Sequence, residues 1–161
     1  MVKSILFVCT GNTCRSSMAE AIARALWTNR ENNKLVLEIS SAGVAASPGM
    51  QASVQAITAL EHLGIDLTSH RSRQLTRELI ITADLILVMT NRHRQFILSM
   101  APETAAKVHL LAEYAFPESA FGDIPDPFGG SVELYRQVAA DLQAAISKVL
   151  EKIQLRSTNF F

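Results

Sequence analysis

An apolar run near the start of the chain is followed by a short polar loop and then by a helical pattern. Residues 5–8 are β-branched, aromatic or otherwise apolar, which is typical of a strand buried on both faces of a parallel sheet. From residue 16 small and apolar residues recur at helical spacing, with the acidic Glu20 in the first turn. Cys9 and Arg15 bracket the loop in the pattern Cys-x5-Arg-Ser. The sequence therefore predicts a strand–loop–helix unit with a cysteine where the strand ends.

The spacing of this loop suits anion binding. A loop that connects the C-terminal end of a strand to a helix curls its backbone N–H groups inward, and the helix N-terminus adds positive potential. Arg15 contributes a planar pair of donors for phosphate oxygens, and such surroundings favour the thiolate form of Cys9. Gly11 and Asn12 tolerate the left-handed conformations that tight loops need. We predict a phosphate-binding loop that contains a nucleophile; the alternative is a buried structural cysteine before an ordinary turn.

A nucleotide-binding loop fits poorly, because neither a Gly-Lys-Ser/Thr ending nor a Gly-x-Gly-x-x-Gly pattern is present. Fifteen acidic and fifteen basic residues cancel, which favours neither nucleic acid nor an anionic membrane as a partner. No apolar run reaches the roughly 20 residues of a membrane-spanning helix, and the N-terminus lacks a signal-peptide pattern. Two cysteines do not make a disulfide framework, so we expect a reducing cytoplasm as the compartment. A monomer is the default expectation.

Strands and helices alternate along the 161 residues, a length typical of one domain. Strands are predicted at residues 5–8, 35–41, 84–90 and 108–111. Helices are predicted at residues 16–32, 52–63, 75–82, 91–100 and 131–155. The alternation predicts a single-domain α/β fold, an open parallel four-stranded sheet with helices on both faces. Residues 1–156 form this domain and residues 157–161 a short tail. In such sheets ligands bind at the C-terminal edge of the strands, where the predicted loop lies.

A proline-flanked aspartate offers a second catalytic group. A thiolate that cleaves a phosphate ester needs a general acid to protonate the leaving group. Asp126 stands between Pro125 and Pro127, which stiffen its backbone, in a long loop over residues 116–130. Asp123 is a competing carboxylate without proline on each side. The alternative is that Asp126 only caps a turn.

These segments together resemble the low-molecular-weight protein tyrosine phosphatases over nearly the whole chain. Residues 8–16 are similar to the phosphate loop of that family, and residues 41–43 to the segment after its second strand. Residues 69–70 are similar to its Ser-His segment, and Asp126-Pro127 to its acid loop. The resemblance implies the low-molecular-weight phosphatase fold and hydrolysis through a cysteinyl-phosphate intermediate. It implies phosphorylated proteins as substrates, with no cofactor and no metal.

The resemblance also implies roles for individual residues. Cys9 would be the nucleophile, Arg15 the clamp on the phosphate and the transition state, and Asp126 the general acid and then the general base for water. The residues implied to contact phosphate or substrate are Thr10, Gly11, Asn12, Thr13, Cys14, Ser16 and Phe128.

The same resemblance implies support for the loop. Asn12, Ser41 and His70 would form a hydrogen-bond network that holds it, and the hydroxyl of Ser16 would assist Cys9 as thiolate and leaving group. The alternative for His70, judged by itself, is a structural histidine whose hydrogen bonds are satisfied.

Two details are similar to the bacterial protein-arginine phosphatases of this fold. Many family members have an aliphatic residue, commonly Ile, at the position of Thr13, and eukaryotic members have an aromatic pair after Asp-Pro, where Phe128 is followed by two glycines. An aliphatic group suits the face of a tyrosine ring, whereas a threonine hydroxyl offers an acceptor to a guanidinium or to the attacking water. We hypothesise that phosphoarginine in proteins is the substrate and that Thr13 is a main selector. A protein-tyrosine phosphatase of the same fold is the alternative.

Cys14 lies in the same curled loop as Cys9. A reversible disulfide between them would protect Cys9 from further oxidation, as the family resemblance also implies. The alternative is that Cys14 serves as a small buried hydrophobe.

Other functions fit less well. Arsenate reductases of this fold rely on cysteines downstream of the loop, and none follows Cys14. A non-catalytic phosphate-binding module would use Arg15 but would need neither Cys9 nor Asp126. The histidines show no metal-ligand spacing with each other or with the cysteines: His62, His70, His93 and His109.

Overall fold

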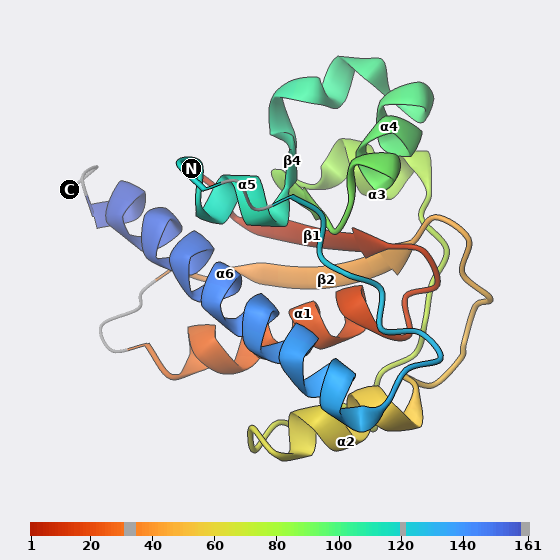
Figure 1. The fold of residues 1–161 in the computed structure, drawn as a ribbon. Helices are drawn as coiled ribbons and strands as arrows, with labels where there is room; N and C mark the ends of the chain where they lie inside the picture. Colours follow the sequence, from red (N-terminus) through yellow and green to blue (C-terminus); the bar gives the residue numbers. More distant parts are fainter. Residues whose placement is uncertain (31–34, 120–121, 159–161) are drawn as a thin grey trace.

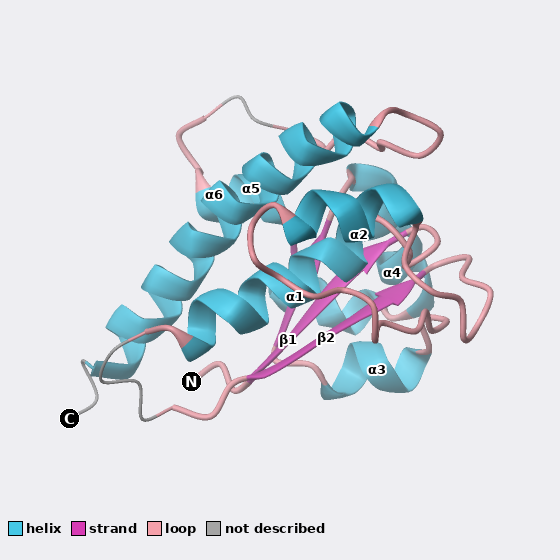
Figure 2. Cartoon of the chain, turned by 90° about the horizontal axis from the view of Figure 1, so that it is seen from below, coloured by secondary structure: helices cyan, strands magenta, loops and turns pink. Residues whose placement is uncertain are grey.

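The computed structural model describes residues 1–30, 35–119 and 122–158. Within these residues one parallel sheet of four strands lies between two layers of helices (Figures 1 and 2). The strands are β1 (Ser4–Cys9), β2 (Glu38–Gly43), β3 (Leu85–Val88) and β4 (Val108–Leu110). The helices are α1 (Arg15–Thr28), α2 (Val54–Glu61), α3 (Arg77–Thr82), α4 (Asn91–Met100), the 3-10 helix η1 (Pro102–Lys107), α5 (Leu111–Ala115) and α6 (Val132–Thr158). The predicted fold class is confirmed.

Both faces of the sheet are covered, and the strand residues divide between them by alternation. Ile5, Phe7 and Cys9 point into a core shared with α1, α2, α5 and α6. Leu6 and Val8 point into a second core shared with α3 and α4. This explains why the central strand is apolar throughout, as the sequence indicates.

The strand order is β2-β1-β3-β4, so the chain leaves β1 first toward one edge of the sheet and later toward the other. Such a reversal opens a crevice at the carboxyl ends of the central strands. The loop after Cys9 starts at this point, between the ends of β2 and β3. The topology therefore positions the predicted phosphate loop where ligands bind in sheets of this kind.

Several element boundaries differ from the prediction. The second strand begins at Glu38 rather than residue 35, because its first partner is Ser4, where β1 begins. α2 begins at Val54, since Ser53 caps it by accepting from the N–H of Ala56. α3 begins at Arg77, because Gln74 forms a bridge with Gly43 at the edge of the sheet instead of helix.

Two short helices, η1 and α5, were not predicted, and the long C-terminal helix is longer than expected. α6 continues to Thr158, so residues 157 and 158 belong to the helix rather than to a separate tail. α1 ends at Thr28, with Asn29 as its C-cap, so the first helix is shorter than the predicted range of 16–32. Residues 31–32 of that prediction and the remainder of the predicted tail lie outside the described residues. No helix in the described part of the chain is long and apolar enough to cross a membrane.

Candidate active site

The candidate nucleophile lies at the end of the central strand. Cys9 is the last residue of β1, and its buried Sγ lies 2.8 Å from the Oγ of Ser16 in the first turn of α1. The N-terminus of a helix carries partial positive charge, so negative charge is favoured at this position. A thiolate at Cys9 would face this helix end and would accept a hydrogen bond from the Ser16 hydroxyl.

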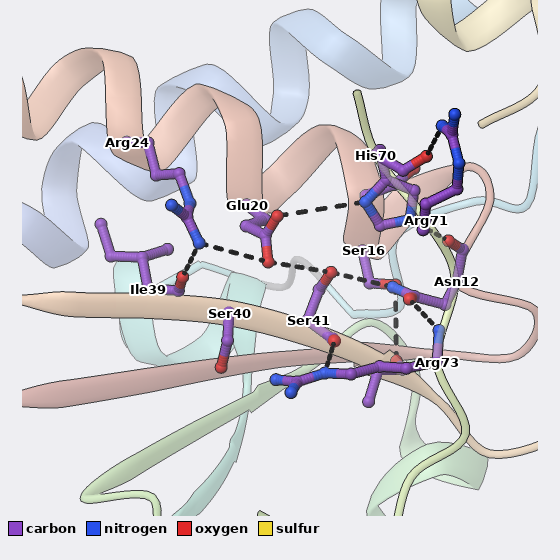
Figure 3. Close-up of polar contacts among 12 residues, drawn as sticks. Asn12, Ser16, Glu20, Arg24, Ile39, Ser40, Ser41, His70, Arg71 and Arg73 are labelled. Atoms are coloured by element: carbon purple, nitrogen blue, oxygen red, sulfur yellow. Dashed lines mark hydrogen bonds and ion pairs between the residues drawn. The ribbon is translucent and has the colours of Figure 1, made fainter. Parts of the chain in front are cut away.

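Asn12 is the centre of the loop and is fully buried (Figure 3). Its φ of 58° lies in the left-handed region, and both its side-chain amide and its carbonyl oxygen are paired. Its Nδ2 donates to Ser16 Oγ (2.8 Å) and to Ser41 Oγ (2.9 Å), and its Oδ1 accepts from the N–H of Arg73 (3.0 Å). Its carbonyl oxygen accepts from Nε2 of His70 (2.7 Å). Four residues from three segments of the chain thus hold one loop residue, which compensates for its strained backbone.

Glu20 extends this network behind the loop (Figure 3). One of its carboxylate oxygens accepts from the Ser41 hydroxyl at 3.4 Å, and the other lies 4.0 Å from Nδ1 of His70. Arg24 lies 3.8 Å from Glu20 and donates to the carbonyl oxygen of Ile39. Because Nε2 of His70 is directed to the loop, the carboxylate faces the other ring nitrogen. Glu20 therefore links Ser41 and His70, two of the four residues that support Asn12.

Gly43 allows the loop to approach the end of β2. A Cβ at Gly43 would lie 2.4 Å from the carbonyl oxygen of Thr10 and 2.9 Å from the N of Asn12. Both neighbours are backbone atoms, so the loop itself would have to move. Gly11 does not need its conformational freedom in the same way, since the positive φ expected of Gly11 and Asn12 is found only at Asn12 within the loop.

Arg15 has a buried guanidinium with one open edge. Its side chain is 5% exposed; Nη1 donates to the carbonyl oxygen of Ile124 (3.1 Å), and Nη2 lies 3.4 Å from a carboxylate oxygen of Asp126. Its buried Nε has no partner. Nε and Nη2 form the edge of a guanidinium that binds two oxygens of one phosphate. An unpaired buried donor is costly, so the edge is suited to an oxyanion.

The structure separates the two candidate carboxylates of the acid loop. Asp126 is directed at Arg15, its side chain is 52% exposed, and it accepts from the N–H of Phe128 at 3.1 Å. Asp123 instead accepts from the N–H of Asn91 at 2.8 Å, at the start of α4. Asp126 therefore lies beside the guanidinium of Arg15, whereas Asp123 stabilises a helix end.

Thr13 and Cys14 lie on the side of the loop that faces α2 and α6. The carbonyl oxygen of Thr13 accepts from the N–H of Ser53 at 3.0 Å, before α2. The Sγ of Cys14 lies 3.2 Å from the Oη of Tyr135 and 3.6 Å from the Oγ of Ser53. Burial, with the contact to Cys14 second, raises the pKa of Tyr135 to about 12, so its hydroxyl remains protonated. Both cysteines are free thiols, and the Cys9–Cys14 disulfide stays a prediction.

A pocket of about 620 Å³ opens beside the loop. Thr10, Arg15, His93 and Asp126 are among its lining residues. Phe128, which follows the acid loop, is 79% exposed and does not line this pocket. The pocket therefore extends from the arginine and the carboxylate toward α4, which is the space available to a group attached to a bound phosphate.

Four residues at the site were not identified from the sequence as part of it: Glu20, Arg73, His93 and Tyr135. His93 follows Thr90 by three residues, which is the spacing of a helix capping box, with histidine in place of the usual Glu or Gln. That spacing was the available signal for His93. The contacts of Arg73 and Tyr135 join distant segments, and no local pattern indicates them.

His93 is expected to make stability depend on pH. Burial, with Arg15 next in effect, lowers the pKa of His93 from 6.5 to about 4. As pH falls from 6.5 to about 4, the unfolded chain takes up a proton at His93 that the folded chain does not, so the free energy of unfolding decreases. Between pH 7 and pH 5 this loss is about 2 kcal/mol. Urea unfolding of the unmutated protein and of His93→Gln measures it, and the variant should lose about 2 kcal/mol less. Equal losses would contradict the prediction.

Among the described residues no three His, Cys, Asp or Glu side chains gather in a way that could hold a metal ion.

Comparison with known proteins finds that the chain is similar to phosphatases. The family model "Low molecular weight phosphotyrosine protein phosphatase" matches residues 4–158. A protein named "Protein-arginine-phosphatase" from Bacillus subtilis (strain 168) is 41% identical over 150 residues, 93% of this chain and 96% of that protein. A protein of the same name from Geobacillus stearothermophilus is 44% identical over 151 residues, 93% and 95% of the two chains. A structure of YwlE arginine phosphatase, a mutant with a phosphorylated active site serine, superposes with a TM-score of 0.85 at 40% identity, over 94% of this chain and 95% of that chain.

Proposed function

Since this chain belongs to the low molecular weight phosphotyrosine protein phosphatase family, we propose that it is a cysteine-dependent phosphatase that hydrolyses phosphoarginine in proteins. The observation that carries the chemistry is the buried, unpartnered Nε of Arg15, whose open edge adjoins both the loop that begins at Cys9 and the carboxylate of Asp126. The substrate is supported by the two relatives named "Protein-arginine-phosphatase", each similar over 93% of this chain. We propose a reducing cytoplasm as its compartment, which suits its two free thiols, and a monomer as the default oligomeric state.

In the first step, the open edge of Arg15 and the loop N–H groups bind the phosphoryl oxygens. The thiolate of Cys9 attacks phosphorus, the bond from phosphorus to the leaving nitrogen breaks, and Asp126 gives its proton to that nitrogen. The Ser16 hydroxyl, itself held by Asn12, stabilises negative charge on the sulfur. The products of the step are the free guanidinium of arginine, a cysteinyl phosphate and the carboxylate of Asp126.

In the second step, Asp126, now a carboxylate, takes a proton from water as the water oxygen attacks phosphorus. The sulfur–phosphorus bond breaks, phosphate leaves and the thiolate of Cys9 is restored. Arg15 carries the charge that develops on the phosphoryl oxygens in both steps. Its contact with the carbonyl oxygen of Ile124 ties the arginine to the acid loop, so the two groups stay together.

Thr13 is the proposed main selector of the substrate. Its side chain is half-buried, its carbonyl oxygen accepts from the N–H of Ser53, and its hydroxyl lies 3.8 Å from the Sγ of Cys14. A hydroxyl accepts a hydrogen bond from a guanidinium N–H, whereas a tyrosine ring beside it would desolvate the hydroxyl without a partner.

Thr13→Ile is expected to lower the ratio of kcat/KM for phosphoarginine over phosphotyrosine at least about tenfold, since it removes the acceptor and adds an apolar ring contact. The measurement uses phosphoarginine, phosphotyrosine and phosphoserine in one peptide sequence. Thr13→Ser, which keeps the hydroxyl, is the matched control and should keep most of the ratio. The proposed substrate is wrong if the unmutated protein cleaves the phosphotyrosine peptide far faster than the phosphoarginine peptide; that result would favour a protein-tyrosine phosphatase.

A further inference from the structure

A short relay of hydrogen bonds joins α4 to the phosphate loop. His93 is 4% exposed, and its Nδ1 lies 3.2 Å from the N and 3.0 Å from the Oγ1 of Thr90, the cap of α4. Its Nε2 lies 2.9 Å from the Oγ1 of Thr10, the residue after the nucleophile. His93 thus contacts both the end of β3 and the loop after β1.

The backbone contact decides which ring nitrogen carries the proton. A backbone N–H can only donate, so Nδ1 of His93 accepts from Thr90. In a neutral imidazole the proton then lies on Nε2, which donates to the Oγ1 of Thr10. The hydroxyl of Thr10 is therefore used as an acceptor on the side of His93. Its own proton and its second lone pair remain available.

The backbone of Thr10 is held separately from its side chain. Its carbonyl oxygen accepts from the N–H of Ala45 at 2.9 Å, and the carbonyl oxygen of Cys9 accepts from the N–H of Val44 at 3.0 Å. The hydrogen bond from His93 therefore orients the hydroxyl of Thr10. Thr10 is exposed, and it lines the same pocket as Arg15 and Asp126.

We propose that Thr10 is a second specificity-determining residue, which accepts a hydrogen bond from the guanidinium of phosphoarginine, and that His93 is the positioning residue that orients it. This inference rests on the proposed function. The phosphorylated guanidinium offers N–H groups close to the phosphorus, and Thr10 lines the pocket that lies beside the phosphate loop. The ester oxygen and ring of phosphotyrosine offer no donor there. The two threonines would contact the substrate from different parts of the loop, Thr10 beside α4 and Thr13 beside α2.

A purely structural role for His93 predicts that its substitution lowers kcat/KM equally for both peptides. Two pairs of variants distinguish this role from the positioning role. His93→Asn keeps an acceptor near the position of Nδ1 for the cap of α4 but is too short to reach Thr10. His93→Gln places an amide N–H near the position of Nε2 and can restore the contact. Thr10→Val removes the hydroxyl with little change of shape, and Thr10→Ser keeps it.

The experiment measures kcat and KM for phosphoarginine and phosphotyrosine in one peptide sequence, with urea unfolding of every variant. His93→Asn and Thr10→Val should each lower the phosphoarginine-to-phosphotyrosine ratio of kcat/KM about tenfold, the loss of one hydrogen bond to substrate. His93→Gln and Thr10→Ser should keep most of the ratio. The double variant His93→Asn/Thr10→Val should lose no more than either single one, because both remove the same contact.

The inference is overturned if His93→Asn lowers kcat/KM equally for both peptides, or if the double variant loses the product of the single effects. If His93→Asn does not fold, Thr10→Val decides the matter, because it alters an exposed side chain and leaves the cap of α4 intact; an unchanged ratio there overturns the inference. If the proposed function is wrong, the unmutated protein shows a phosphoarginine-to-phosphotyrosine ratio of kcat/KM below one. If only this inference is wrong, the unmutated ratio stays above one and the variants fail to lower it.

Discussion

Cys9→Ser is expected to abolish turnover of the phosphoarginine peptide, with kcat at least about 10⁴-fold lower. A serine hydroxyl at the end of β1 is not ionised at neutral pH. The variant therefore lacks the anionic nucleophile that the hydrogen bond from Ser16 would stabilise. The substitution conserves shape in a buried position, so the loop and Arg15 should remain in place. Steady-state and single-turnover assays measure the loss.

Binding serves as the control for Cys9→Ser. The variant should bind the phosphorylated peptide with a Kd within a few-fold of the KM of the unmutated protein, because the Arg15 edge and the loop N–H groups are retained. If Cys9→Ser turned over the peptide at an undiminished rate, Cys9 would not be the nucleophile. If the unmutated protein bound phosphopeptide but cleaved no phosphorylated substrate, a non-catalytic phosphate-binding module would be favoured.

Asp126→Asn is expected to lower kcat for the phosphoarginine peptide by about 10²–10³-fold, since an amide can neither protonate the leaving nitrogen nor take the proton of water. A substrate with a weakly basic leaving group, such as p-nitrophenyl phosphate, needs less proton transfer in the first step. Its first step, measured as the burst of p-nitrophenol, should therefore be affected less. Comparing the burst with the rate of the steady state separates the acid role of Asp126 from its base role.

Asp123→Asn is the matched control, because it changes an identical side chain in the same acid loop. Asp123 accepts from the N–H of Asn91 and has no contact with Arg15 in the described structure. We expect kcat within about threefold of the unmutated value and a loss of about 1 kcal/mol in the free energy of unfolding, measured in urea. Equal kcat losses in the two variants would remove Asp126 from the role of general acid.

Much of the fold was predictable because it rests on local patterns. The apolar run before Cys9 and the helical spacing after Arg15 determine the first unit, and alternation of such units favours a parallel sheet covered on both faces. Strand limits were less predictable, because a strand extends only as far as its partner: β2 begins at Glu38 because β1 begins at Ser4. Hydrophobicity alone places the strand three residues earlier.

The amino-acid sequence by itself determined the nucleophile, the arginine and the proline-flanked aspartate as candidates, because their residue types and local spacing carry the chemistry. Only the tertiary structure decided that Asp126 rather than Asp123 faces Arg15, and that Glu20 and Arg73 support the loop at Asn12. Only the tertiary structure brings His93 to Thr10, residues separated by 83 positions. The physical reason is that such contacts depend on the strand order, which seats the ends of β1, β2 and β3 side by side. Local periodicity specifies strands and helices but not which of them are neighbours.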